Sequence, residues 1–232
     1  MTDATNASPR RLWARQQLAQ MPAHLRTEPW HDLRYELTAE LLDRQFADRW
    51  PARVLDVGGH SPMTELMARM WPRSFVSYTN GQDVRYELSD QEPGYWDLVV
   101  MTEVLEHLHD LPTDDYHARA MWTGSGQRAC LRLIRESLAP GGLCFLTTPN
   151  AVGLAVVERV LAAKRPMSFE PHVREMTEHE VAGLARECGL AVAQSGGWVC
   201  WAHHGLQPHR LHRVRELVGD RPDDLWFLLK AA

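Results

Sequence analysis

Apolar side chains in the first fifty residues recur at the spacing of amphipathic helices. Residues 11–21 and 33–50 carry them three and four positions apart, and the second stretch has Leu33, Leu37, Leu41, Leu42 and Phe46. This spacing gathers the apolar side chains on one face of a helix, where they can pack against a core. The pattern therefore predicts an N-terminal helical cap over residues 1–50.

From residue 51 onward, short apolar runs alternate with helical patterns. Strands are expected at residues 53–57, 74–79, 96–101, 143–147, 190–194 and 225–230, and helices at 61–70, from 103, and at 127–138, 151–163 and 177–188. This alternation is typical of α/β proteins. We expect a Rossmann-like, doubly wound, mainly parallel seven-stranded sheet flanked by helices, in a domain of residues 51–232. Ligands of such sheets bind beyond the carboxyl ends of the strands.

Composition narrows the class of protein. A chain of 232 residues with 44% hydrophobic content can bury a full core. The net charge of −5 argues against tight binding to nucleic acid, which needs a basic face to neutralise phosphates. The four cysteines form no C-x-x-C pair, so they are expected to be reduced core residues. With neither a secretion signal nor a membrane-spanning run expected, we predict a cytoplasmic protein.

The first expected strand leads through Asp56-Val57-Gly58-Gly59 into a helix. Ser61 stands where it can cap that helix, and Pro62 occupies its first turn. Glycines let the backbone approach a ligand closely, and a helix N-terminus offers free N–H groups. Taken alone, the turn is explained equally well by a nucleotide-like ligand or by the steric demands of a strand-to-helix turn.

Two later segments change this balance. Residues 96–108 read WDLVVMTEVLEHL and residues 138–150 read LAPGGLCFLTTPN. Together with the glycine turn, in this order, they resemble class I S-adenosylmethionine (SAM) dependent methyltransferases over residues 54–230. The resemblance implies SAM as cofactor, with Gly58 and Gly59 facing its methionine part, Asp56 holding its amino group or the nearby loop, and Thr102 also in contact with it.

The chain departs from this family at two places. His60 and Pro62 stand where the family has its second and third glycines, so a wider turn is expected, or a His60 side chain directed at cofactor or substrate. The next strand of the family ends in an acid that binds the ribose hydroxyls. Here the strand ends in Asn80, the favoured ribose or adenine contact, with Asp83 as its rival. The other interpretation of Asn80 is that Asn-Gly simply makes a turn.

Glu103, Glu106 and His107 form a candidate metal site. On a helix, their spacing of i, i+3 and i+4 would project them from one face. Two carboxylates and an imidazole that converge repel each other unless a proton or a cation lies between them. The donor set suits a hard or borderline divalent ion. Alternatively, these residues only pack beneath the cofactor.

A narrower resemblance favours the metal. The small-RNA 3′-terminal 2′-O-methyltransferases show E-x-x-E-H, then T-P-N, then a histidine shortly before a Met-Thr helix start, and the ubiquinone-pathway O-methyltransferases share the E-x-x-E-H. Here His172 precedes Met176-Thr177. The resemblance implies that Glu103, Glu106, His107 and His172 hold a Mg or Mn ion, and that Glu106, His107 and His172 are catalytic. An ion that chelates two vicinal oxygens orients the acceptor and lowers its pKa.

We therefore expect a SAM-dependent O-methyltransferase that acts on a small hydroxylated molecule, a sugar, polyol or phenol, in a biosynthetic route. One alternative is an RNA 3′-terminal ribose 2′-O-methyltransferase, which the acidic net charge opposes. Another is a non-catalytic SAM-binding regulatory domain, because fold alone does not fix chemistry. Neither nucleic acid nor a membrane is the expected partner, and a homodimer is left open.

Overall fold

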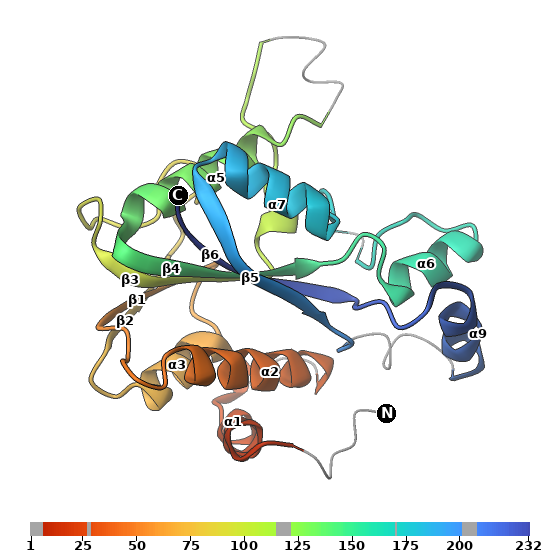
Figure 1. The fold of residues 1–232 in the computed structure, drawn as a ribbon, viewed down its shortest axis with the longest axis horizontal. Helices are drawn as coiled ribbons and strands as arrows, with labels where there is room; N and C mark the ends of the chain where they lie inside the picture. The colour runs from red at the N-terminus through yellow and green to blue at the C-terminus, as the bar shows by residue number, and fades with distance from the viewer. Residues whose placement is uncertain (1–6, 27–28, 115–121, 170, 201–207) are drawn as a thin grey trace.

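The computed structural model describes residues 7–26, 29–114, 122–169, 171–200 and 208–232. One sheet lies between two layers of helices (Figure 1). The strands are β1 (Arg53–Val57), β2 (Phe75–Tyr78), β3 (Trp96–Thr102), β4 (Leu138–Pro149), β5 (Leu190–Trp198) and β6 (Asp224–Ala231). The helices are α1 (Pro9–Ala19), α2 (Pro29–Gln45), α3 (Pro62–Met70), α5 (Ser125–Ser137), α6 (Leu154–Leu161), α7 (Glu178–Glu187) and α9 (Pro208–Val218), with 3-10 turns η2 (Ala23–Leu25) and η3 (Leu105–His107).

The strand order is β2-β1-β3-β4-β6-β5. Strands β2, β1, β3 and β4 run parallel, and β6 is antiparallel to both of its neighbours, β4 and β5. The expected doubly wound, mainly parallel α/β fold is confirmed. The described residues form six strands rather than the expected seven, and residues 79–95, between β2 and β3, form turns without a helix.

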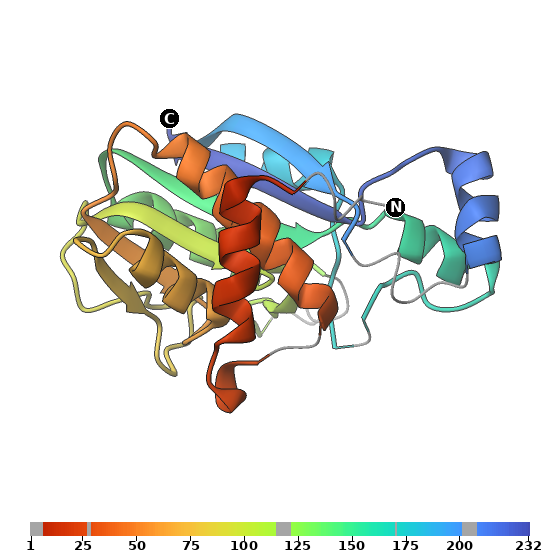
Figure 2. The same cartoon turned by 90° about the horizontal axis from the view of Figure 1, so that it is seen from below.

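The N-terminal helices are a layer of this fold. Helices α1, α2 and α3 cover one face of the sheet, and α5 and α7 cover the other (Figures 1 and 2). Leu42 of α2 is fully buried in one core cluster with Val54 and Leu98 of the sheet. Residue 50, where a domain boundary is expected, lies between α2 and β1. Because the apolar face of α2 packs against the sheet, the helix is fixed in position, and so are the polar side chains that it also buries.

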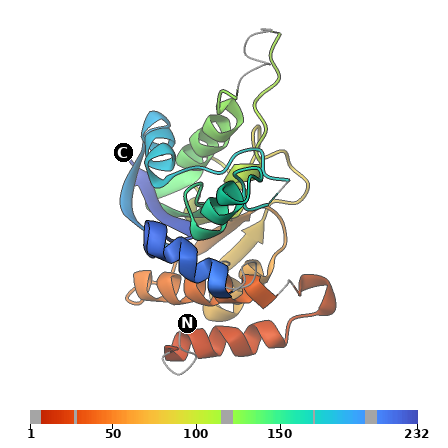
Figure 3. The same cartoon turned by 90° about the vertical axis from the view of Figure 1, so that its right-hand side faces the viewer.

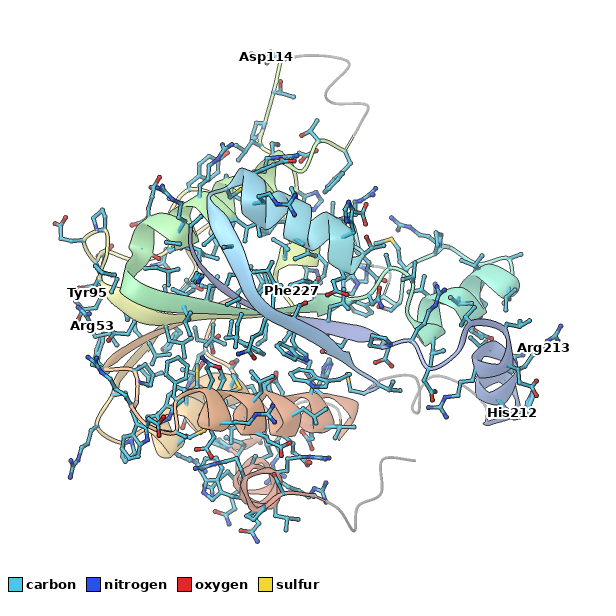
Figure 4. The ribbon with its side chains drawn as sticks, viewed as in Figure 1. Arg53, Tyr95, Asp114, His212, Arg213 and Phe227 are labelled. Atoms are coloured by element: carbon cyan, nitrogen blue, oxygen red, sulfur yellow. The ribbon has the colours of Figure 1, made fainter. Side chains whose placement is uncertain are left out.

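Each face of the sheet has its own core cluster. Phe227 of β6 is fully buried and lies at the centre of the molecule, among side chains that fill the space between sheet and helices (Figure 4). The four cysteines are free and buried, as expected for a reduced protein. No helix in the described part of the chain has the length and apolar character to span a membrane.

Candidate functional site

The glycine turn after β1 lies beside the residues that follow strands β2 and β3. Gly58 and Gly59 have φ values of +122° and +105°, which disfavour any residue with a Cβ. A Cβ on Gly58 would lie 2.6 Å from Val104 Cγ2, in the loop after β3. The Gly58 N–H donates to Thr79 Oγ1, at the end of β2, over 2.9 Å. The turn therefore lies at the carboxyl edge of the sheet, as the sequence predicts.

Asp56 holds the start of α3. Ser61 is the N-cap of that helix, where its Oγ accepts from the backbone N–H of Met63 and Thr64. The Asp56 carboxylate accepts in turn from Ser61 Oγ, over 2.7 Å, and from Thr64 Oγ1. Burial raises the pKa of Asp56 to about 6, against the opposing effect of these hydrogen bonds. Of the two roles expected for Asp56, these contacts serve the one of holding the nearby loop.

Three predicted cofactor contacts lie around the end of β2. The His60 ring stacks on Tyr78, with centroids 4.8 Å apart. Asn80 and Asp83 are exposed just beyond the strand. The Asp83 carboxylate is 2.6 Å from the Arg85 guanidinium, which holds its pKa below the usual range. Asp83 is thus engaged in an exposed ion pair, and the choice between Asn80 and Asp83 as the ribose contact stays a prediction.

The turn after β3 differs from the expectation. The helix predicted from Glu103 is wrong: Glu103 has φ +58°, and only the short η3 turn follows, at Leu105–His107. The Glu103 N–H donates to Thr147 O over 3.1 Å, and its carboxylate accepts from Thr147 Oγ1 over 2.7 Å. Pairing with β4 therefore fixes this reversal, and helical periodicity cannot reveal such a tertiary contact. A non-glycine residue with a left-handed backbone conformation costs about 1–3 kcal/mol, and such residues cluster at functional sites.

Glu103 instead belongs to a buried charge cluster with Arg34 of α2 and Asp224, the first residue of β6. Arg34 is 3% exposed and Asp224 fully buried. Burial raises the pKa of Glu103 and raises that of Asp224 well above its usual value, while the Arg34 charge lowers both. Arg34 Nε and Nη1 and Asp224 Oδ1 have no hydrogen-bond partner among the described residues. Unpaired buried polar atoms are costly, so each needs an explanation such as a bound ligand, ion or water.

Sequence reasoning missed Arg34 and Asp224. One signal for Arg34 was available: Arg34, Thr38 and Leu42 share one face of α2, and all three are buried. A charged residue on the core face of a helix needs a reason. Asp224 gave no comparable signal, because an acid before an apolar strand is ordinary.

Glu106, His107 and His172 do come together. Glu106 Oε1 lies 3.9 Å from His107 Nε2 and 3.9 Å from His172 Nε2. Each of the three residues offers a donor atom, and these atoms lie within 4.8 Å of one another. The other oxygen of Glu106 accepts from Thr148 Oγ1 over 3.0 Å. Three of the four predicted ligands thus converge, and the Glu103 carboxylate is not part of the group.

Backbone hydrogen bonds bring His172 to this place. The N–H groups of Val173 and Arg174 both donate to the Glu106 carbonyl, over 2.8 and 3.2 Å. They dock the loop before α7 on the turn after β3. His172 is 6% exposed, and its ring meets that of His107 edge-on at 4.7 Å.

The residues present fit a divalent ion. Burial and the nearby Glu103 carboxyl raise the pKa of Glu106 well above its usual value, and its Oε1 is buried without a hydrogen-bond partner in the described structure. Burial and the neighbouring His172 lower the pKa of His107, which favours the neutral imidazole that binds metals. Three donors that share one ion at about 2.1 Å lie about 3.0–3.6 Å apart. The two 3.9 Å separations and the widest pair must therefore close by a few tenths of an ångström or more when an ion binds.

The chain matches a protein family described as "Methyltransferase domain" over residues 30–195, more than half of its length, and it belongs to that family. The predicted methyltransferase class is thereby confirmed. The protein named ubiquinone biosynthesis O-methyltransferase of Neisseria meningitidis (serogroup A) is 27% identical over 179 residues, which cover 65% of this chain and 68% of the relative. The protein of the same name from Xanthomonas euvesicatoria is 30% identical over 172 residues, covering 63% and 65%.

Solved structures share the fold. The N-methyltransferase NodS of Bradyrhizobium japonicum, solved with S-adenosyl-L-homocysteine, superposes with a TM-score of 0.50 at 16% identity, covering 97% of this chain and 99% of NodS. A SAM-dependent methyltransferase of Archaeoglobus fulgidus gives 0.52 at 14% identity, covering 84% and 94%. At such identities the likeness extends to the Rossmann-like architecture alone.

Proposed function

We propose that this chain is a SAM-dependent O-methyltransferase for small molecules that carry a hydroxyl beside a second oxygen, assisted by a Mg or Mn ion. Glu106, His107 and His172 would hold the ion. The observation that carries the proposal is the buried Glu106 Oε1, which faces two imidazole nitrogens and has no hydrogen-bond partner in the described structure. The names of the curated relatives, ubiquinone biosynthesis O-methyltransferases, support O-methylation.

The methionine end of SAM carries a carboxylate and an ammonium group. Arg34 offers unpaired guanidinium N–H groups for the carboxylate, and guanidinium–carboxylate pairing is strong when it is buried and bidentate. Glu103 and Asp224 offer oxygens for the ammonium. The backbone of the Gly58-Gly59 turn, with His60 and Thr102, would line the rest of the cofactor, and Asn80 would bind the ribose.

In the transfer, the acceptor oxygen forms a bond to the methyl carbon as the bond from that carbon to sulfur breaks, and the proton of the acceptor hydroxyl passes to solvent water. When bound, the ion would lower the pKa of the acceptor hydroxyl. The chain itself aligns donor and acceptor for in-line displacement, and such positioning supplies much of the rate. If no ion takes part, the neutral and partly exposed His107 becomes the base that accepts the proton.

The test is methyl transfer to catechol and vicinal-diol panels by protein stripped with a chelator and then resupplied with Mg²⁺ or Mn²⁺. We expect turnover only with the ion. Glu106→Gln should lower kcat/KM by about 100-fold or more, because metal assistance is worth several kcal/mol. Glu178→Gln is the matched control: that exposed carboxylate accepts from Ser195 Oγ and should leave the rate unchanged.

The contrary outcomes are distinct. Full activity after chelation rejects the metal and leaves His107 as the base. Salt-sensitive methylation of a small-RNA 3′ end, with no small-molecule turnover, favours the RNA enzyme. Binding of SAM with no turnover on any panel favours a regulatory domain.

A further inference from the structure

A buried carboxylate contacts His172 on the side of the ring away from Glu106. Glu175 is 5% exposed, and a single oxygen of it, Oε1, receives three donors. His172 Nδ1 lies 2.6 Å from it, the Ser168 N–H 2.6 Å and Ser168 Oγ 2.5 Å. No part of the proposed reaction uses Glu175 directly.

This contact selects one tautomer of His172. An ionised carboxylate only accepts hydrogen bonds, so the proton of a neutral imidazole must lie on Nδ1. The lone pair then lies on Nε2, and Nε2 is the atom 3.9 Å from Glu106 Oε1. Glu175 thus presents the metal-binding nitrogen of His172 to the candidate ion. The Pro171 backbone carbonyl accepts a hydrogen bond from the His107 ring.

A purely structural role would be to close the loop that carries His172. The loop is already held without Glu175, however, because the N–H groups of Val173 and Arg174 donate to the Glu106 carbonyl. A parallel backbone bridge between Asn150 and Met176 holds its far end. The Glu175 carboxylate also binds Ser168 at the start of the loop. At His172, where the loop is already docked, it adds the orientation and the tautomer of the ring.

We propose that Glu175 is a positioning residue, which fixes the tautomer and direction of the His172 ring so that Nε2 can bind the divalent ion. The inference rests on the metal-assisted function proposed above. Such outer partners of metal-bound histidines typically change metal affinity by about 10–100-fold when they are removed.

Two substitutions separate the parts of this role. Glu175→Ala removes the acceptor altogether. Glu175→Gln keeps a carbonyl oxygen and loses the charge. Its amide NH₂ cannot take the place of Oε1, because the Ser168 N–H would meet it donor to donor. Gln should therefore preserve the tautomer. Glu178→Gln again serves as the control at an exposed carboxylate.

Two measurements on the full chain test whether Glu175 has this role: one of the His172 tautomer and one of the affinity for metal. Long-range ¹H–¹⁵N correlation spectra of the metal-free protein report which His172 nitrogen carries the proton. Titration with Mn²⁺, followed by electron paramagnetic resonance, gives the Kd. We expect a proton on Nδ1 in the wild type and in Glu175→Gln, and a mixture of tautomers in Glu175→Ala. The Kd should rise by about 10–100-fold in the Ala variant. It should rise by about 2–10-fold in the Gln variant, because a neutral amide oxygen makes the ring a less basic ligand than a carboxylate does.

The inference is overturned if Glu175→Ala keeps both the wild-type tautomer and the wild-type Kd. The metal proposal would survive that result, because the wild-type titration tests it separately. A wild type that binds no Mn²⁺ overturns the metal proposal and this inference together. If thermal unfolding shows that the Ala variant does not fold, Glu175→Gln decides: a Kd equal to that of the wild type overturns the inference, and a weaker Kd with the tautomer kept supports it.

Discussion

Replacing Arg34 by Met removes the cation of the buried charge cluster while keeping an unbranched side chain. Arg34 is 3% exposed and acts electrostatically on both Glu103 and Asp224, so its loss leaves two buried carboxyls without their counter-charge. The same guanidinium is the proposed partner of the SAM carboxylate. The substitution therefore has two separable effects, one on the unfolding free energy and one on the affinity for the cofactor.

Removing one partner of a buried ion pair costs about 3–5 kcal/mol. Here Glu103 and Asp224 can respond by binding protons, because burial already raises the pKa of each and Arg34 is the charge that lowers it. In the variant the folded state then binds more protons than the unfolded state, so its stability recovers as pH falls. We expect a loss of about 3 kcal/mol at pH 8, the low end of that range, and a smaller loss at pH 5.5.

For the cofactor, a hydrogen bond to a charged group is worth about 1.5–3 kcal/mol, which corresponds to a Kd about 10–100-fold weaker. Urea unfolding at the two pH values gives the first effect, and calorimetric titration with S-adenosylhomocysteine gives the second. Arg53→Met is the control. Arg53 pairs with Asp97 over 2.8 Å at the opposite end of the sheet, next to Tyr95 (Figure 4). Such half-exposed pairs are worth less than about 1 kcal/mol.

Two results would refute this reasoning. An Arg34→Met variant that binds S-adenosylhomocysteine as tightly as the wild type shows that Arg34 does not hold the methionine carboxylate. A stability loss of the same size at both pH values shows that Glu103 and Asp224 do not take up the proton.

Further predictions concern Asp56 and Gly58, at the end of β1 and in the turn that follows it. The pKa of Asp56 is raised from 3.8 to about 6 in the folded protein, so the stability it contributes is full below pH 3.8 and is lost as pH rises through 6. Asp56→Asn keeps an oxygen for Ser61 and Thr64 and should gain up to about 3 kcal/mol at pH 7, measured by urea unfolding across pH; an unchanged pH profile would contradict this. Gly58→Ala places a Cβ 2.6 Å from Val104 Cγ2 at φ +122° and should cost about 2–4 kcal/mol. Gly141→Ala, also at positive φ but with nothing within 4 Å, should cost only about 1–2 kcal/mol, and equal losses would show that the contact with Val104 is unimportant.

The parts of the structure that could be predicted from sequence are local. The β1 turn and the start of α3 follow from two glycines, the Ser61 cap and Pro62, all within a few residues of one another. Glu106 and His107 are adjacent, so any motif that includes them keeps them together. His172 entered only through resemblance to known enzymes, since nothing in its own segment shows that it docks on Glu106.

The remainder depends on tertiary contacts. Glu103 adopts its left-handed conformation against β4, and an i, i+3, i+4 spacing therefore misled the helix assignment. Arg34 and Asp224 meet Glu103 from α2 and from β6, respectively. Glu175 contacts His172 only through a loop whose shape is set by backbone bonds to another segment. In each case the contacting residue either belongs to a distant element or is placed by a loop whose sequence has no hydrophobic periodicity.

The place of β6 in the sheet has a consequence for how the enzyme forms. This strand enters between β4 and β5, and among the described residues β5 pairs with no other strand. Until β6 has left the ribosome, a nascent chain therefore presents the open edge of β4 and an unpaired β5, the kind of exposed strands that invite aggregation and chaperone binding. Asp224, the first residue of β6, pairs with Pro149 at the edge of the sheet where the proposed cofactor site lies. Figure 3 shows this edge of the sheet end-on, behind α6 and α9. The proposed cofactor site therefore remains incomplete until β6 has entered the sheet.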